Sequence, residues 1–125
     1  MEPKSVIEKL WERIQARDWR AVGDLLEEDL VVEWPATAER IEGRSNYVAV
    51  NSEYPEGWTI RVLRIVAEGD DVVSEVEVPH EVMGVFRVAS FWTVRDGRIV
   101  RGREYWTGLG AETPPEWRAG YVKRI

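Results

Sequence analysis

The sequence predicts an α+β protein in which three N-terminal helices pack on one antiparallel sheet. In most of the chain before Ser52, apolar residues recur at helical spacing, whereas beyond Trp58 they alternate with polar residues, as in a half-buried strand. The later segments are joined by short turns, and Asp96-Gly97 is a strong hairpin signal, so consecutive strands should pair antiparallel. Helices that precede the strands, rather than alternating with them, are typical of α+β proteins.

The first helix is predicted from Ser5 to Arg17. Ser5 fits the N-cap position, and Glu8, three residues later, completes a capping-box pattern. One face of this segment is apolar. Its members are Val6, Ile7, Leu10, Trp11 and Ile14. A second, short helix follows, capped by Asp18 and ending before the acidic run 27–29.

A short strand and a third helix complete the first half. Residues Leu30 to Trp34 are largely β-branched or aromatic and are stopped by Pro35, which favours a strand. A polar connection over 36–40 follows. The third helix is predicted from Arg44 to Ser52, and it places Tyr47, Val50 and Asn51 on one side.

The second half is predicted to be a meander of strands. These strands are expected over 58–67, 72–80, 85–95 and 98–107. The remaining residues, 108–125, have no clear period and form an irregular tail that could pack through Trp117 and Tyr121. The length of 125 residues fits a single domain over residues 1–125.

Alternation divides the last three strands into two chemically different faces. The mostly apolar face holds Val72, Ser74, Val76, Val78, His80, Phe86, Val88, Ser90, Trp92, Val94, Val100, Gly102, Glu104 and Trp106. The mixed face holds Val73, Glu75, Glu77, Arg87, Ala89, Phe91, Thr93, Ile99, Arg101, Arg103 and Tyr105. We expect the helices to cover the apolar face, and the mixed face to be either solvated or a dimer surface.

Polar residues on the apolar face are the candidates for function. Glu104 comes first, because a carboxylate among apolar side chains must be paired, protonated or near water, and each state shifts its pKa. His80, the only histidine, lies at a strand end and could assist Glu104 or face solvent. Ser90 could contact a ligand or simply bond the backbone.

Aromatic residues could line a cavity beside Glu104. Trp11, Trp34, Trp92 and Trp106 lie where they could form its walls, and Tyr47 and Asn51 could orient a ligand oxygen. The alternative is a packed core in which Glu104 and His80 only satisfy the indole N–H groups. The pattern of residues leaves both interpretations open.

Composition argues against several other functions. The absence of cysteine and the single histidine argue against a thiolate or histidine metal site, and no phosphate-binding loop is present, so neither a metal nor another cofactor is expected. A net charge of −6 without a basic cluster argues against nucleic-acid and membrane partners. The charged N-terminus is unlike a signal peptide, and the lack of cysteine is compatible with a reducing compartment, so we expect a cytoplasmic protein.

The order of elements resembles the nuclear transport factor 2 superfamily, and its SnoaL-like branch most. The stretches that carry the resemblance are Val31-Val-Glu-Trp-Pro35, the helix after Gly43, Arg95-Asp-Gly-Arg-Ile99 and Arg103-Glu-Tyr-Trp106, within a similarity over residues 5–107. The resemblance implies a cone formed by the helices and a strongly curved sheet, with one internal pocket. It also implies a homodimer through the outer sheet face.

Site residues carry over from this resemblance only in part. The general base of ketosteroid isomerases would lie at Trp34, their oxyanion-hole tyrosine near Leu10 and their acidic partner near Ser90, so that mechanism is not expected here. The carboxylate on the last strand of limonene epoxide hydrolases and SnoaL-like cyclases matches Glu104. The Arg-x-Asp partner of the hydrolases has no clear match.

The sequence therefore leaves three possible functions open. The first is an isomerase, cyclase or hydrolase that performs acid/base chemistry on an apolar small molecule through Glu104, assisted by His80. The second is a pocket protein that binds such a molecule without converting it. The third is an interaction domain with a filled core, dimeric through the charged residues of the mixed face.

Overall fold

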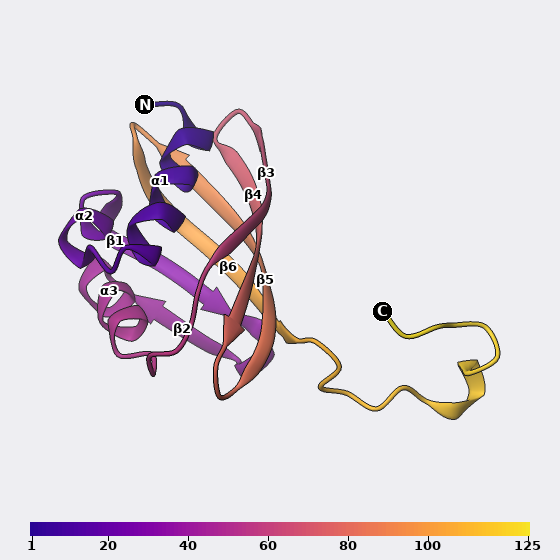
Figure 1. Cartoon of the computed structure of the whole chain (residues 1–125). Coiled ribbons are helices and arrows are strands. Elements are labelled where there is room, and N and C mark those ends of the chain that lie inside the picture. Colours follow the sequence, from indigo (N-terminus) through magenta and orange to yellow (C-terminus); the bar gives the residue numbers. More distant parts are fainter.

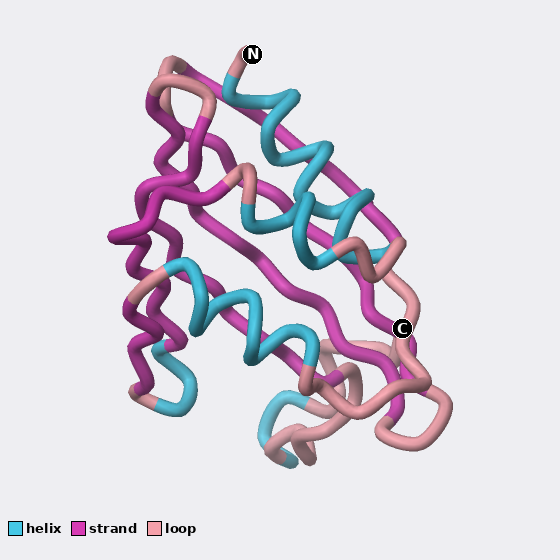
Figure 2. Tube along the Cα trace, turned by 90° about the vertical axis from the view of Figure 1, so that its left-hand side faces the viewer, coloured by secondary structure: helices cyan, strands magenta, loops and turns pink.

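The computed structural model describes residues 1–125 as three helices over one face of a six-stranded sheet, which confirms the α+β prediction (Figures 1 and 2). The helices and strands are α1 (Pro3–Gln15), α2 (Trp19–Gly23), β1 (Leu26–Trp34), β2 (Glu39–Glu42), α3 (Arg44–Ser52), β3 (Arg61–Glu68), β4 (Asp71–His80), β5 (Gly84–Arg95) and β6 (Arg98–Gly108). Two 3-10 turns occupy Pro35–Thr37 and Glu116–Arg118. The order of strands across the sheet is β2-β1-β6-β5-β4-β3.

The helix starts differ from prediction in one case. α1 begins at Pro3 with Glu2 as its N-cap residue and no side-chain cap, so the capping box predicted at Ser5 is wrong. Proline is favoured in the first turn because its missing N–H has no partner there anyway. In α2, by contrast, the Asp18 carboxylate accepts from the backbone N–H of Ala21 at 3.2 Å, as predicted.

The prediction was least accurate at the edge of the sheet formed by β2 and β1. β1 begins at Leu26, four residues earlier than expected, because Leu26 pairs in parallel with Ile99 of β6 and pairing resumes at Val31. The acidic run 27–29 thus lies within a strand and not at a helix end. Residues Glu39–Glu42, of which the first two were expected to end a polar connection over 36–40, form β2 and pair antiparallel with β1. An exposed edge strand needs no apolar alternation, so its sequence carries little signal.

The meander β3 to β6 is antiparallel throughout, as predicted, but one irregularity changes the assignment of faces. Thr93 pairs with Arg101 whereas Val94 pairs with Ile99, so Val100 is an extra residue in β6. Ile99 is therefore fully buried and Val100 only partly so, the reverse of the prediction. A bulge of this kind puts the inward and outward residues before it out of step by one position with those after it. Glu104 lies beyond the bulge and keeps its predicted inward direction.

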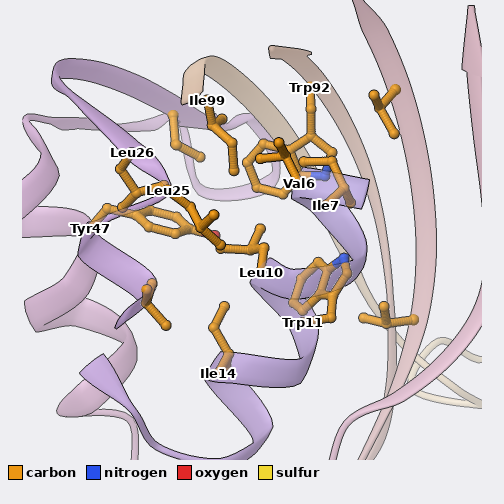
Figure 3. Packing of buried hydrophobic residues seen from close by; sticks show 14 of the residues in the cluster. Val6, Ile7, Leu10, Trp11, Ile14, Leu25, Leu26, Tyr47, Trp92 and Ile99 are labelled. Carbon is orange, nitrogen blue, oxygen red and sulfur yellow. The ribbon is translucent and has the colours of Figure 1, made fainter. Parts of the chain in front are cut away.

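The core lies between the helices and the concave face of the sheet. It takes the predicted apolar stripe of α1 together with inward residues of β1, β4, β5 and β6. Figure 3 shows the rings of Tyr47 and Trp92 directed into it, with Leu10 and Ile14 of α1. The two rings meet edge to face, with centroids 6.4 Å apart. Trp11 and Trp92, both predicted to line a cavity, are thus largely core residues.

The chain beyond β6 does not pack on the sheet. Residues 109–125 project away from the strands and contain only the short turn at Glu116–Arg118 (Figure 1). Trp117 and Tyr121, the side chains through which this tail was expected to pack, are 76% and 87% exposed, so that expectation is wrong for the isolated chain. None of the helices has the length and hydropathy that a membrane-spanning segment needs.

Candidate functional site

Glu104 is the buried acid at the centre of the candidate site. It lies in β6 with only 2% of its surface exposed, and it pairs directly with Ser90 of β5. Its Oε1 accepts from the indole Nε1 of Trp34 on β1 and from the hydroxyl of Tyr47 on α3, each at 3.1 Å. Its Oε2 accepts from Ser90 Oγ at 2.7 Å. Three elements thus hold one carboxyl group, and a carboxylate has about four acceptor positions, so Oε2 keeps one that no protein group fills.

The surroundings of Glu104 favour its protonated form. Burial raises the pKa of Glu104, because removal from water penalises the charged carboxylate, and the hydrogen bonds from Ser90, Trp34 and Tyr47 offset this only in part. The pKa of Tyr47 is raised well above its usual value by burial and then by the neighbouring Glu104. Tyr47 therefore remains a protonated phenol that donates to Glu104. The carboxyl group of Glu104 therefore holds its proton more readily than that of an exposed glutamate.

A cavity of about 360 Å³ opens beside Glu104. Its lining consists of Trp34, Ala36, Thr37, Glu39, Val50, Asn51, Tyr54, Met83, Phe86, Glu104 and Trp106. A second hollow of about 20 Å³ shares Asn51, Tyr54, Glu104 and Trp106 with it, which is room for about one water molecule. A mostly apolar hollow with a few polar groups is typical of small-molecule sites, and this one falls within their size range.

The structure brings most of the predicted site residues together. Trp34, Tyr47 and Ser90 contact Glu104 directly, while Trp106 and Asn51 form cavity wall. The amide of Asn51 is partly occupied, since its Nδ2 donates to the carbonyl of Tyr47 at 2.8 Å. Trp11 touches only the small hollow.

Trp11 and Trp92 share a different polar anchor. Their indole N–H groups donate to Ser74 Oγ at 3.1 and 3.0 Å. Ser74 lies on β4, directly opposite Ser90. The two serines therefore have different partners in the core. Ser74 accepts from two indole N–H groups, whereas Ser90 bonds the carboxyl group of Glu104. Trp92 does not line the cavity.

His80 is not brought to Glu104 or to the wall of the 360 Å³ cavity. Its Nε2 lies 3.0 Å from the carbonyl of Pro55, while its Nδ1 accepts from the backbone N–H groups of Val82 and Met83. These partners assign the proton to Nε2, because Nδ1 must be the acceptor. Both ring nitrogens are engaged with backbone, so the geometry gives His80 a positioning role for the loops on either side of it.

Sequence reasoning missed several of the residues that line the cavity. Ala36, Thr37 and Glu39 come from the turn and edge strand after Pro35, and Met83 and Phe86 come from the β4–β5 turn and β5. The signal available was Pro35, which ends β1 and turns the chain over the site. Tyr54 was also missed. Its ring meets those of Trp106 and His80 edge to face, and burial raises the pKa of its hydroxyl.

No group of three or more histidine, cysteine, aspartate or glutamate side chains that could hold a metal ion comes together in this fold. The sequence profile described as the SnoaL-like domain matches residues 7–102. The chain belongs to the SnoaL-like family. No curated protein gives a significant match.

Solved structures agree with this family. A candidate ketosteroid isomerase from Kribbella flavida is 31% identical, with a TM-score of 0.89, and the match covers 98% of this chain and 89% of that one. A nuclear transport factor 2-like protein of unknown function from Burkholderia xenovorans is 26% identical, with a TM-score of 0.80, and covers 98% and 94%. An epoxide hydrolase of the LEH-like type from Mycobacterium tuberculosis is 25% identical, with a TM-score of 0.72, and covers 84% and 82%. This SnoaL-like chain therefore has the cone fold that the resemblance implied.

Proposed function

We propose that the protein is an enzyme in which Glu104 transfers a proton to or from an apolar small molecule held in the 360 Å³ cavity. The observation that carries this proposal is a carboxyl group, buried and with a raised pKa, in the wall of a mostly apolar hollow. A catalytic acid works best when its pKa lies near the working pH, and burial is one way to bring a glutamate there.

The partners of Glu104 suit both states of a proton carrier. Trp34 and Tyr47 donate to Oε1, so they stabilise the negative charge left after the proton departs. The hydroxyl of Ser90 can donate to an ionised Oε2 or accept from a protonated one, because it rotates. In the forward direction, Oε2–H gives its proton to a ligand oxygen and the carboxylate keeps the electron pair. In the reverse direction, the carboxylate removes a proton from the ligand.

The walls indicate the class of ligand. Trp34, Trp106, Phe86 and Val50 offer apolar surface, and Asn51 adds an amide at the side of Glu104. A hydrocarbon skeleton bearing one carbonyl, epoxide or hydroxyl oxygen fits this distribution. The names of the similar structures, a candidate ketosteroid isomerase and an epoxide hydrolase, point to the same two oxygen chemistries.

The test replaces the acid while keeping its shape. In Glu104→Gln the amide oxygen still accepts from Trp34 and Tyr47, and the amide nitrogen can donate to Ser90, so folding and ligand uptake should persist. Turnover of a responsive ketone or epoxide should fall by about 10²–10⁴-fold. Glu33→Gln is the matched control, because Glu33 neighbours Trp34 on β1 but forms an exposed ion pair with Arg40. Activity retained in Glu104→Gln would refute the proposal.

A non-catalytic pocket protein is the second candidate, favoured by the three donors that already occupy Glu104. Fluorescence titration separates it from the enzyme, because Trp34 and Trp106 line the cavity and report binding. Saturable quenching by members of a ketone and epoxide panel, with no conversion of any of them, would establish binding alone. No response to the whole panel would count against both candidates.

A further inference from the structure

Two buried indole N–H groups near Glu104 have no hydrogen-bond partner in the protein. They belong to Trp58 and Trp106. A buried donor of this kind gives up its hydrogen bond to water and gains nothing in return, so such groups are rare in folded proteins. A phenylalanine ring at either position would be apolar throughout and would avoid this loss. The two N–H groups are explained if an acceptor from outside the chain meets them.

The same core provides acceptors for other indoles. Ser74 Oγ accepts from two of them, at 3.1 and 3.0 Å, and Oε1 of Glu104 accepts from a third at 3.1 Å. The fold can thus place a hydroxyl or a carboxyl group where an indole needs one. Trp58 and Trp106 differ from these three indoles in having no such group within reach.

Both unpartnered indoles line the same small space. This is the hollow of about 20 Å³, whose wall also includes Glu104, Asn51 and residues of α1. Trp106, Asn51 and Glu104 line the 360 Å³ cavity as well, so the hollow adjoins the cavity on the side that faces α1. A space of this size holds about one oxygen-sized atom. The two N–H groups therefore lie in the wall of a one-atom extension of the candidate ligand site.

The two indole rings are held in place before any ligand arrives. The ring of Trp106 meets three other aromatic rings edge to face, with centroids 6.1 to 6.4 Å away. These rings belong to Trp34, Tyr54 and Phe86. The ring of Trp58 lies 3.3 Å from Cζ of Arg17, which also donates to the Trp58 carbonyl at 2.7 Å. Donors fixed in this way lose little freedom when they bind an acceptor, which favours binding.

The chemistry of the hollow selects the kind of atom that fits it. An indole N–H can donate a hydrogen bond but cannot accept one, so the occupant must be an acceptor. A carbonyl oxygen has two lone pairs, carries no hydrogen and projects from its skeleton as a single atom. An epoxide oxygen also accepts, but it is flanked by two ring carbons, which a one-atom hollow does not admit.

We propose that this hollow binds the carbonyl oxygen of the ligand and that the indole N–H groups of Trp58 and Trp106 select for it. The apolar skeleton of the ligand then fills the 360 Å³ cavity, and the carbons next to the carbonyl lie near Glu104, which lines both spaces. The assignment rests on the proposed function only in taking this cavity as the ligand site. It narrows the class of ligand to ketones and aldehydes.

The first test observes the two N–H protons by nitrogen-15 NMR. Saturation with 2-decalone, a rigid two-ring ketone, should move the indole proton resonances of Trp58 and Trp106 downfield, because a new hydrogen bond deshields the proton. The analogue with a methylidene group in place of the oxygen has the same skeleton and no acceptor, so it should give no downfield shift. Absence of binding by 2-decalone, or binding without a downfield shift of either resonance, would overturn the proposal.

The second test removes the N–H group and keeps the ring. Benzothienylalanine, in which sulfur replaces the indole N–H, is introduced at position 58 or 106. Each replacement should raise the dissociation constant of 2-decalone about 2–10-fold, as expected for the loss of one hydrogen bond between neutral groups. The dissociation constant of the methylidene analogue should not change. Equal effects on the two ligands would mean that the indoles contribute shape alone, and the assignment would be wrong.

The same replacement at Trp117 is the matched control. Trp117 is 76% exposed and lines neither the cavity nor the hollow, so the affinities of both ligands should stay as in the wild type. A water molecule is the alternative occupant of the hollow. Water held there permanently would keep its cross-relaxation with the two indole protons after saturation with 2-decalone, whereas a carbonyl oxygen would abolish it. Persistent cross-relaxation would therefore refute the proposal.

These readouts are independent of turnover. In Glu104→Gln the indole shifts caused by 2-decalone should remain, because Trp58 and Trp106 keep their N–H groups. A protein that binds the ketone through its indoles and converts nothing would contradict the proposed function alone. Conversion of an epoxide that depends on Glu104, without any indole shift on addition of 2-decalone, would contradict this assignment alone.

Discussion

Removal of the Ser90 hydroxyl tests how the site holds a charge. In Ser90→Ala, Oε2 of Glu104 loses its donor at 2.7 Å and no other protein group replaces it. The ionised carboxylate then becomes harder to maintain in the core, so the pKa of Glu104 should rise further. The protonated form loses less, because its hydrogen bond to Ser90 joins two neutral groups.

The expected magnitude follows from burial and charge. Ser90 and Glu104 are 0% and 2% exposed, so solvent does not replace the lost bond. A hydrogen bond to a charged group contributes about 1.5–3 kcal/mol, and one between neutral groups about 0.5–1.5 kcal/mol. The free energy of unfolding should therefore fall by the larger amount where Glu104 is ionised and by the smaller amount where it is protonated.

The contribution of Glu104 to stability depends on pH. Because its pKa is raised in the folded state, Glu104 binds a proton more tightly there than in the unfolded chain, so its contribution to stability falls as pH rises from the unfolded pKa through the folded one. Ser90→Ala enlarges that fall and extends it to higher pH, because it raises the folded pKa further. Urea unfolding followed by tryptophan fluorescence, from mildly acidic to neutral pH, measures it as the difference from wild type.

Ser74→Ala is the control for this experiment. Ser74 is equally buried and lies directly opposite Ser90, but it accepts only from the indoles of Trp11 and Trp92. Its removal should destabilise the fold by an amount that does not change with pH, since no titrating group is involved. Parallel pH dependence of the two variants would refute the assignment of Ser90 to the carboxylate.

Two further predictions concern packing and His80. A Cβ at Gly102 would lie 2.5 Å from Cζ3 of the buried Trp92, so Gly102→Ala should lower the free energy of unfolding by about 1–3 kcal/mol, whereas Gly23→Ala, with only ordinary contacts, should cost nothing measurable. Equal stability of the two variants in urea would contradict this interpretation of the Trp92 pocket. His80→Ala should destabilise the fold by about 1–3 kcal/mol through the unpaired Pro55 carbonyl and turn N–H groups, with kcat per folded molecule retained. A selective loss of kcat would return His80 to the catalytic machinery.

Much of the fold followed from the sequence because periodicity reports burial. The alternation over β4 and β5 correctly predicts which residues face inward, and it marks Ser90 as a polar exception on an apolar face. Glu104 stands out in the same way on β6. The apolar stripe of α1 could be predicted equally well. These elements bury one side completely, and such burial forces a strict pattern on their residues.

The features that could not be predicted from the sequence depend on contacts between segments that are distant along the chain. β2 is polar and exists because it pairs with β1, and the bulge at Val100 exists because β5 and β6 change register there. Likewise, the partners of His80 come from two loops that no spacing rule connects. The direction of residues 109–125 had no local signal either, since their aromatic side chains suggested packing that the single chain does not provide.

The most direct test of the central claim is a carbon-13 NMR titration of the glutamate side-chain carboxyl groups, with Glu104→Gln used to assign the resonance of Glu104. The account predicts that this carboxyl group titrates at a pH above that of the exposed glutamates, because burial raises its pKa. A midpoint at or below that of the exposed glutamates would mean that its three donors outweigh desolvation. Glu104 would then be a permanently charged anchor of the core, not a carrier of protons.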